Sequence, residues 1–259
     1  MNPPVWPITS EDILKINSSI IWRQLDDIPN KGFCLPNLLK AMKQEGCFLC
    51  NAVIADSEYT LNSLFYEGIT DEDIQKELIE SGGLCNWHAW RATYFLSASG
   101  GLKILYQSLL ENLQVTIAHW IRASEEARGP RLFSPRRIAK TDIGCPICKW
   151  NHNLEKCYLS DFLDLFKDDI VASEFEKSFG LCLPHLQVAA DDFPQHINLS
   201  CLLKIEQKKF EVLREQLVQS DHKQDNQSFR GSKGADPTSW RQAIELFVGK
   251  RGIFPRSAQ

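Results

Sequence analysis

Cysteine and histidine residues in this chain follow one pattern twice. Each copy has a Cys-x-x-Cys pair and, further on, a Gly-Leu-Cys-x-x-His turn. The first and third cysteines are separated by 38 residues in the first copy and 37 in the second, and the copies begin 98 residues apart. The side chains are Cys47, Cys50, Cys85 and His88 in the first copy and Cys145, Cys148, Cys182 and His185 in the second. This matched spacing indicates a tandem duplication.

Three thiolates and one imidazole form a ligand set for a transition metal. Two soft-ligand pairs, each separated by two residues, can converge tetrahedrally on one Zn²⁺, and a closed set of four leaves no position for water or substrate. We therefore predict that each repeat carries a structural Cys3His site, with two zinc ions in all and no catalysis at the metal. The same ligands would serve if the pairs were exchanged between the copies, and the sequence leaves these two arrangements open.

Other chemistry is conceivable for the same residues. An iron–sulfur cluster, usually held by four thiolates, would make the protein a redox or stress sensor, although closed Cys/His sets favour zinc. Dithiol redox chemistry at a Cys-x-x-Cys pair belongs beside a βαβ unit, which the sequence does not predict. Covalent haem would need a histidine after the second cysteine, where the chain has Asn51 and Lys149.

The remaining cysteines and histidines show no catalytic pattern. Cys34, Cys157 and Cys201 have no partner at ligand spacing and are expected to be small core side chains. His152 lies four residues after Cys148 and could compete with His185 as a ligand, but the first copy has no counterpart. A solvent-facing helix position is therefore expected for His152.

An acidic run in the second copy needs separate mention. It consists of Asp161, Asp164, Asp168 and Asp169. Such a run is more often a solvated helix face than a catalytic cluster. We therefore assign no catalytic residue and do not expect an enzyme.

The composition is that of a globular chain. It has 259 residues, of which 43% are apolar and 24% charged, enough to bury a core. A net charge of −4 provides no global positive field for nucleic acid or an anionic membrane. The first residues lack the features of a signal peptide, and no apolar run approaches the roughly 20 residues of a membrane span. Nine cysteines, an odd number, favour metal thiolates over disulfides. We expect a cytoplasmic protein.

Apolar periodicity predicts an all-α protein with no strand. A long amphipathic helix follows each Cys-x-x-His pair, and the first of these carries Leu102, Leu105, Leu109, Leu113, Ile117 and Trp120 on one side. A final helix carries Trp240, Ile244, Phe247 and Val248 on one side and is expected to dock on the body.

The chain divides into successive segments. They are an N-terminal segment (1–35), a first metal-binding helical repeat (36–126), a basic linker (127–143), a second metal-binding helical repeat (144–219), a flexible linker (220–236) and a docking C-terminal helix (237–252). The basic linker, with Arg128, Arg131, Arg136, Arg137 and Lys140, is the one feature that suggests nucleic acid. No interleaved aromatic platform accompanies it, so a solvated linker is favoured.

Local signals place the ligands at helix starts. Thr70 with Asp73 has the spacing of a capping box. The helix that starts near Thr70 should end at Ser81-Gly82-Gly83, because glycine can adopt the left-handed conformation that reverses the chain. Cys85 then falls at the start of the next helix, where the dipole favours a thiolate.

These motifs carry a resemblance. Cys145-Pro-Ile-Cys148, the two Gly-Leu-Cys-x-x-His turns and the terminal stretch from Ser239-Trp240-Arg241 to Gly249 resemble an uncharacterised bacterial family with duplicated Cys-Pro-x-Cys and Gly-x-Cys-x-x-His signatures. The resemblance spans about residues 36–250 and implies a mostly helical cytosolic protein. It implies no particular activity, substrate or catalytic residue. The first copy departs from it at Phe48, where the family has proline.

The leading hypothesis is a zinc-stabilised helical binding or scaffold protein with a protein partner. The first alternative is an iron–sulfur or thiol-based redox sensor. The second is a nucleic-acid-associated regulator acting through the basic linker.

Overall fold

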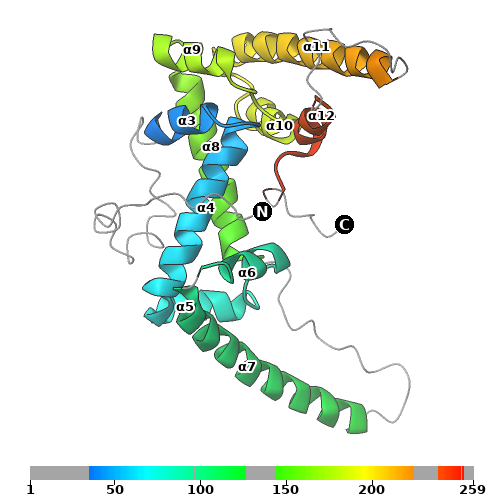
Figure 1. Cartoon of the computed structure of the whole chain (residues 1–259). Helices are drawn as coiled ribbons and strands as arrows, with labels where there is room; N and C mark the ends of the chain where they lie inside the picture. The colour runs from blue at the N-terminus through cyan, green and yellow to red at the C-terminus, as the bar shows by residue number, and fades with distance from the viewer. Residues whose placement is uncertain (1–34, 96, 127–143, 225–238, 252, 254–259) are drawn as a thin grey trace. The chain divides into compact units, whose positions relative to one another are not determined.

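The computed structural model describes residues 35–95, 97–126, 144–224, 239–251 and 253. These residues form helices and no strand, which confirms the all-α class. The helices are α3 (Leu35–Met42), α4 (Phe48–Tyr66), the 3₁₀ turn η1 (Gly68–Thr70), α5 (Glu72–Glu80), α6 (Asn86–Ala92), α7 (Ala98–Glu126), α8 (Pro146–Asp164), α9 (Asp169–Lys177), α10 (Leu183–Asp192), α11 (Leu199–Gln224) and α12 (Ser239–Val248) (Figure 1). Cys34, the basic linker and most of the linker 220–236 lie outside the described residues.

Two compact units make up the chain. Of the described residues, unit 1 comprises 58–95, 97–126 and 144–150, and unit 2 comprises 35–57, 151–224, 239–251 and 253. Each unit has its own hydrophobic core. Each unit also combines residues from both motif copies. Helix α4 contributes residues 48–57 to unit 2 and 58–66 to unit 1, whereas α8 contributes residues 146–150 to unit 1 and 151–164 to unit 2.

The core of unit 2 is built around aromatic rings. Phe48, Phe162 and Phe175 are fully buried, and each has its ring centroid within 6.0 Å of the other two. Phe166 packs edge-on against Phe162 at 5.4 Å. Phe48 lies between the first Cys pair, whereas the other rings belong to the second copy, so packing brings that pair onto the second copy.

The core of unit 1 is mainly aliphatic. Its fully or almost fully buried side chains include Leu61, Leu64, Phe65, Ile69, Leu78, Leu105 and Ile147. Ile147 lies between Cys145 and Cys148, so the second Cys pair is held in a core whose other members come largely from the first copy.

The helices that precede the Cys-x-x-His turns begin in the same way. Asp71 caps α5, and its carboxylate accepts hydrogen bonds from the N–H groups of Asp73 and Ile74. Asp168 caps α9 by the same pattern. The predicted capping box at Thr70 is therefore displaced by one residue, since Thr70 ends η1 and its hydroxyl donates to the Glu67 carbonyl instead.

Glycine reverses the chain before each Cys-x-x-His pair. Gly83 has φ +91° and Gly180 has φ +94°, both in the left-handed region. The next helices begin directly after Cys85 and Cys182, which are their N-caps. The predicted start of a helix at Cys85 is confirmed.

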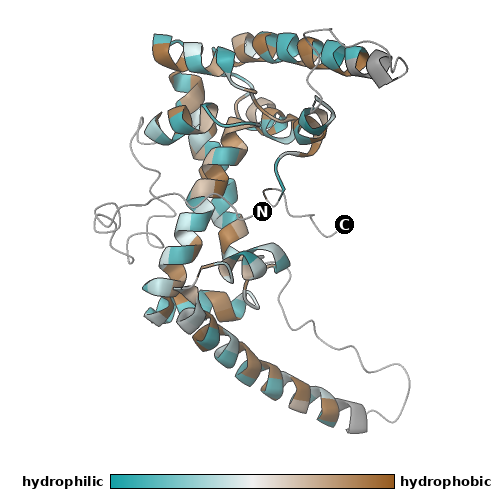
Figure 2. Ribbon diagram, in the orientation of Figure 1, coloured by the Kyte–Doolittle hydropathy of each residue, from teal (hydrophilic) through white to brown (hydrophobic). Residues whose placement is uncertain are grey.

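Helices α7 and α11 are the long elements, with 29 and 26 residues. Apolar and polar residues alternate around both of them (Figure 2). No helix in the described part of the chain combines the length and apolar character required to cross a bilayer.

Helix α12 packs against α10 and α11 with Leu246 buried. Trp240, Ile244, Phe247 and Val248 are each more than half exposed. The apolar side that these four residues form is thus the outer side of the helix. Polar contacts explain the orientation, because Glu245 accepts a hydrogen bond from the Cys47 N–H and the Lys250 ammonium donates to the Glu45 carbonyl.

Candidate metal centres

All eight predicted ligands are described, and they gather into two groups. Quartet A consists of Cys47, Cys50, Cys182 and His185 and lies in unit 2. Quartet B consists of Cys85, His88, Cys145 and Cys148 and lies in unit 1. Each quartet takes its Cys-x-x-Cys pair from one copy and its Cys-x-x-His pair from the other. The expectation that each repeat has a ligand set of its own therefore needs correction, and the exchanged arrangement is the one found.

Packing around the Cys pairs explains the exchange. Phe48 is buried among rings of the second copy, and its N–H donates to the Gly180 carbonyl at 3.3 Å. A proline at position 48 has no N–H and could not make this bond. The departure from Cys-Pro-x-Cys in the first copy thus accompanies a specific contact between its Cys pair and the turn that leads into Cys182.

In quartet A the histidine faces the three sulfur atoms with one ring nitrogen. His185 Nδ1 lies 3.4 Å from Cys47 Sγ, 3.6 Å from Cys50 Sγ and 3.3 Å from Cys182 Sγ. The sulfur atoms of Cys50 and Cys182 are 3.8 Å apart. All of these donor atoms therefore converge on one point.

Quartet B repeats this geometry. His88 Nδ1 lies 3.3 Å from Cys85 Sγ, 3.5 Å from Cys145 Sγ and 3.3 Å from Cys148 Sγ. The sulfur atoms of Cys85 and Cys148 are 3.6 Å apart. The two quartets are thus built alike although their chain order differs.

These separations match the edges of a coordination tetrahedron around one ion. Bonds of about 2.3 Å to sulfur and about 2.0–2.1 Å to nitrogen give edges of about 3.8 Å between sulfurs and about 3.6 Å between sulfur and nitrogen. The observed sulfur–sulfur distances are 3.6 and 3.8 Å, and the sulfur–nitrogen distances are 3.3–3.6 Å. Both quartets could hold a metal ion.

Each ligand pair sits at the beginning of a helix. Quartet A joins the starts of α4 and α10, and quartet B joins the starts of α6 and α8. A helix N-terminus carries about half a positive charge. Three thiolates with a divalent ion have a net charge of −1, so the ends of α4 and α10 together would offset the charge of quartet A.

Without a metal, protons mediate the attraction within each quartet. Burial acts to raise the pKa of the Cys47 thiol, but hydrogen bonds from Cys182, Cys50 and His185 lower that pKa well below its usual range. Hydrogen bonds from Cys145 and Cys148 likewise lower the pKa of Cys85. Burial opposes protonation of His88, yet hydrogen bonds with Cys145 and Cys85 raise its pKa to about 9. Hydrogen bonds from neighbouring thiols instead raise the pKa of Cys50, Cys182 and Cys148. Each quartet therefore favours one thiolate, Cys47 or Cys85, beside a histidine whose pKa is raised. A bound cation would take the place of the protons.

Quartet A has additional support from α12 and the turn after it. The Cys47 N–H donates to Glu245 Oε1 at 3.1 Å, and the Lys250 N–H donates to Cys50 Sγ at 3.4 Å. Lys250 also binds the Glu45 carbonyl and the Asn51 side chain through its ammonium group. The C-terminal segment therefore closes over the first Cys pair, a contribution that the sequence pattern did not indicate.

A buried carboxylate faces the other nitrogen of His185. His185 Nε2 lies 3.6 Å from Glu155 Oε1, and Glu155 is 4% exposed. A carboxylate behind a ligating histidine fixes its orientation and raises its basicity. No sequence motif marks Glu155, because its position opposite His185 depends on how α8 packs against α10.

The quartets differ in exposure. Cys47, Cys50, Cys182 and His185 are all 0% exposed. In quartet B, His88 and Cys145 are buried, but Cys85 and Cys148 are partly exposed. The same donor set therefore occurs in two different environments.

Other candidate residues lie apart from the quartets. His152 is exposed and faces Glu155 at 3.6 Å, as expected for a solvent-facing position. Cys157 is buried as predicted, whereas Cys201 is exposed, contrary to expectation.

Three of the four acidic residues, Asp164, Asp168 and Asp169, are exposed, in line with the predicted solvated face. Asp161 is the exception at 6% exposed. Asp164 also lies 3.2 Å from His196 Nε2, and Asp168 is a helix cap, so these two carboxylates have structural contacts as well.

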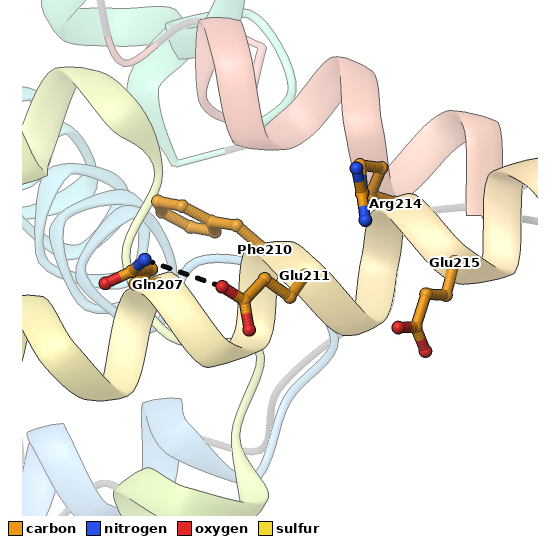
Figure 3. A pocket seen from close by; sticks show the side chains of 5 residues that line it. All are labelled: Gln207, Phe210, Glu211, Arg214 and Glu215. Atoms are coloured by element: carbon orange, nitrogen blue, oxygen red, sulfur yellow. Dashed lines mark hydrogen bonds between the residues drawn. The ribbon is translucent and has the colours of Figure 1, made fainter.

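A shallow hollow lies on α11 beside α12 (Figure 3). It is lined by Gln207, Phe210, Glu211, Arg214 and Glu215. All five side chains come from one helix, and Gln207 donates to Glu211 at 3.4 Å. The lining contains no thiol, hydroxyl or imidazole, so it does not provide a nucleophile.

No protein-family model, curated protein or solved structure matches this chain. The resemblance to a family with duplicated cysteine signatures therefore stays a prediction. What the structure defines is an all-helical protein with two Cys/His clusters that could hold metal ions.

Proposed function

We propose that the chain is a zinc-stabilised helical binding or scaffold protein, in which quartets A and B each hold one structural Zn²⁺. The observation that carries this proposal is the tetrahedral spacing of both quartets, in which all four ligand atoms lie within 4.8 Å of one another. Four protein ligands leave no open position for a substrate, so the metal acts architecturally.

The same spacing favours a single ion over a cluster. An iron–sulfur cluster places several iron and sulfide ions between its thiolates, so its protein ligands must lie farther apart than those of one ion. Among single ions, a Cys3His set of tetrahedral geometry is typical of zinc. The redox alternative based on a cluster is therefore less well supported.

A bound ion would connect distant parts of the chain. Quartet A joins Cys50 to Cys182 across 132 residues, and quartet B joins Cys85 to Cys148 across 63 residues. Because the unfolded chain rarely brings such residues together, metal binding adds to folding free energy. Zinc would hold the starts of two helices together in each unit.

The proposed partner is a protein. A net charge of −4 gives no general attraction for nucleic acid. With both metals architectural, recognition would use the helical surface.

Metal analysis and chelation test this proposal. The purified full chain should be colourless and contain two zinc equivalents by elemental analysis, and complete removal of the metal should lower helix content in circular dichroism. Cys201→Ser, which changes an exposed cysteine outside both quartets, should keep both equivalents. A brown protein with iron and labile sulfide, or unchanged helix content after removal of the metal, would contradict the proposal.

A further inference from the structure

The ligand residues of the two quartets differ in exposure to solvent. Every ligand residue of quartet A is 0% exposed, and the Lys250 N–H donates to Cys50 Sγ. Quartet B has two partly exposed cysteine residues, Cys85 and Cys148. A dissolved oxidant should therefore reach quartet B more readily than quartet A.

The two partly exposed cysteines, Cys85 and Cys148, are also close to each other. Cys85 Sγ and Cys148 Sγ are 3.6 Å apart. A disulfide bond is about 2.05 Å long, so the two sulfur atoms need to approach by about 1.5 Å. Both cysteines lie at helix starts, and accessible cysteines beside a second cysteine are the ones that oxidise reversibly to a disulfide.

We propose that quartet B is a peroxide-responsive thiol switch, in which Cys85 and Cys148 form a disulfide and release the metal, while quartet A keeps its metal. This inference rests on the proposed function, because it assumes that both quartets hold zinc. It assigns different roles to two sites that have the same ligands.

The reaction balances with hydrogen peroxide as the oxidant. One thiolate attacks peroxide, forms an S–OH bond and releases hydroxide as the O–O bond breaks. The second thiolate attacks that sulfur, forms the S–S bond and releases a second hydroxide. Two electrons pass from the sulfur atoms to peroxide, and two protons from the buffer convert the two hydroxides to water. The metal then has two ligands left, Cys145 and His88, and dissociates.

Loss of one ligand set would act locally. Quartet B links the starts of α6 and α8, and Cys85 is the N-cap of α6. Release of the metal therefore removes the link between these two helix starts within unit 1. Reduction of the disulfide and fresh zinc should restore it.

Peroxide titration of the zinc-loaded full chain tests the switch. Zinc release is followed with a chromogenic chelator, and disulfides are located by peptide mass mapping. We expect one zinc equivalent to be released at least about tenfold faster than the second, together with a Cys85–Cys148 disulfide. Dithiothreitol with added zinc should restore two equivalents. Cys201→Ser serves as the matched control and should behave like the wild type.

The outcomes separate this inference from the proposed function. Fewer than two zinc equivalents before peroxide is added would overturn both. Two equivalents that leave at equal rates, or a first disulfide between Cys50 and Cys182, would overturn the switch alone. Cys85→Ser should prevent the fast disulfide, and if that variant does not fold, the map of wild-type disulfides decides the question.

Discussion

The substitution Phe48→Pro separates what the motif implies from what the structure implies. It would give the first copy a Cys-Pro-Leu-Cys sequence like the Cys-Pro-Ile-Cys of the second. Position 48 is the first residue of α4, where proline is normally favoured. The motif therefore predicts a neutral or stabilising change, and the structure predicts the opposite.

The magnitude follows from three contributions. Phe48 is 0% exposed, with ring centroids 4.9 Å from Phe162 and 6.0 Å from Phe175, so loss of most of the ring should cost about 2–4 kcal/mol. Loss of the N–H bond to the Gly180 carbonyl should cost about 1 kcal/mol. Proline also restricts the unfolded chain, which should offset the loss of stability by about 0.4–1 kcal/mol. The net expectation is a loss of about 2–5 kcal/mol.

Guanidinium unfolding of the zinc-loaded chain at fixed free zinc measures this change, because free ligand concentration sets the apparent stability. Pro146→Ala is the matched control at the first residue of α8 and should cost less than Phe48→Pro. Phe48→Leu, which keeps the N–H group, should fall between the wild type and Phe48→Pro. A Phe48→Pro midpoint at or above that of the wild type would refute the packing argument.

Three further predictions concern residues around the quartets. Asp71→Ala and Asp168→Ala should each lower the free energy of unfolding by about 1 kcal/mol in denaturant titrations, and Thr70→Ala should cost less than Asp71→Ala if the cap is assigned correctly. Gly180→Ala should destabilise the chain by more than about 1 kcal/mol, because φ is +94° and a Cβ atom would lie 2.6 Å from a carboxylate oxygen of Glu206. Gly100→Ala in α7 is the control and should be neutral or stabilising, because a Cβ atom there would meet open space. Burial raises the pKa of Glu206 from 4.5 to about 8, so the folded state holds its proton more tightly than the unfolded state, and wild-type stability should fall as pH rises from about 5 to about 8. Glu206→Gln keeps an acceptor for the Leu181 N–H, and its stability should depend less on pH over that range; an unchanged pH profile would argue against a buried proton at Glu206.

Much of the local structure could be predicted from the sequence. Gly83 and Cys85 mark the turn and the helix start correctly, because a left-handed residue and a cap are properties of a few neighbouring residues. The eight ligand candidates were also found by local spacing. Local error was small, as at Thr70, where the neighbouring Asp71 has the stronger acceptor and takes the cap.

Pairing between the copies could not be predicted in the same way. The four ligand pairs have similar spacing, so the sequence does not indicate which pairs meet. Burial of Phe48 on the rings of the second copy, and of Ile147 in the core of unit 1, decides the pairing through tertiary contacts. The orientation of α12 likewise depends on Glu245 and Lys250. Their hydrogen-bond partners lie 198 and 205 residues away along the chain.

Similar ligand sets in different surroundings could serve two different uses. The donor atoms fix the charge and geometry and therefore the kind of ion that fits. The surroundings fix access, and here they differ. Glu245 and Lys250 contact the Cys pair of quartet A, while Cys85 and Cys148 are partly exposed in quartet B. Under the proposed function, covering one site preserves a permanent structural link and leaves the other open to chemistry at sulfur. A difference in oxidation rate between two otherwise alike quartets would then come from packing alone, since neither the number nor the type of ligands differs.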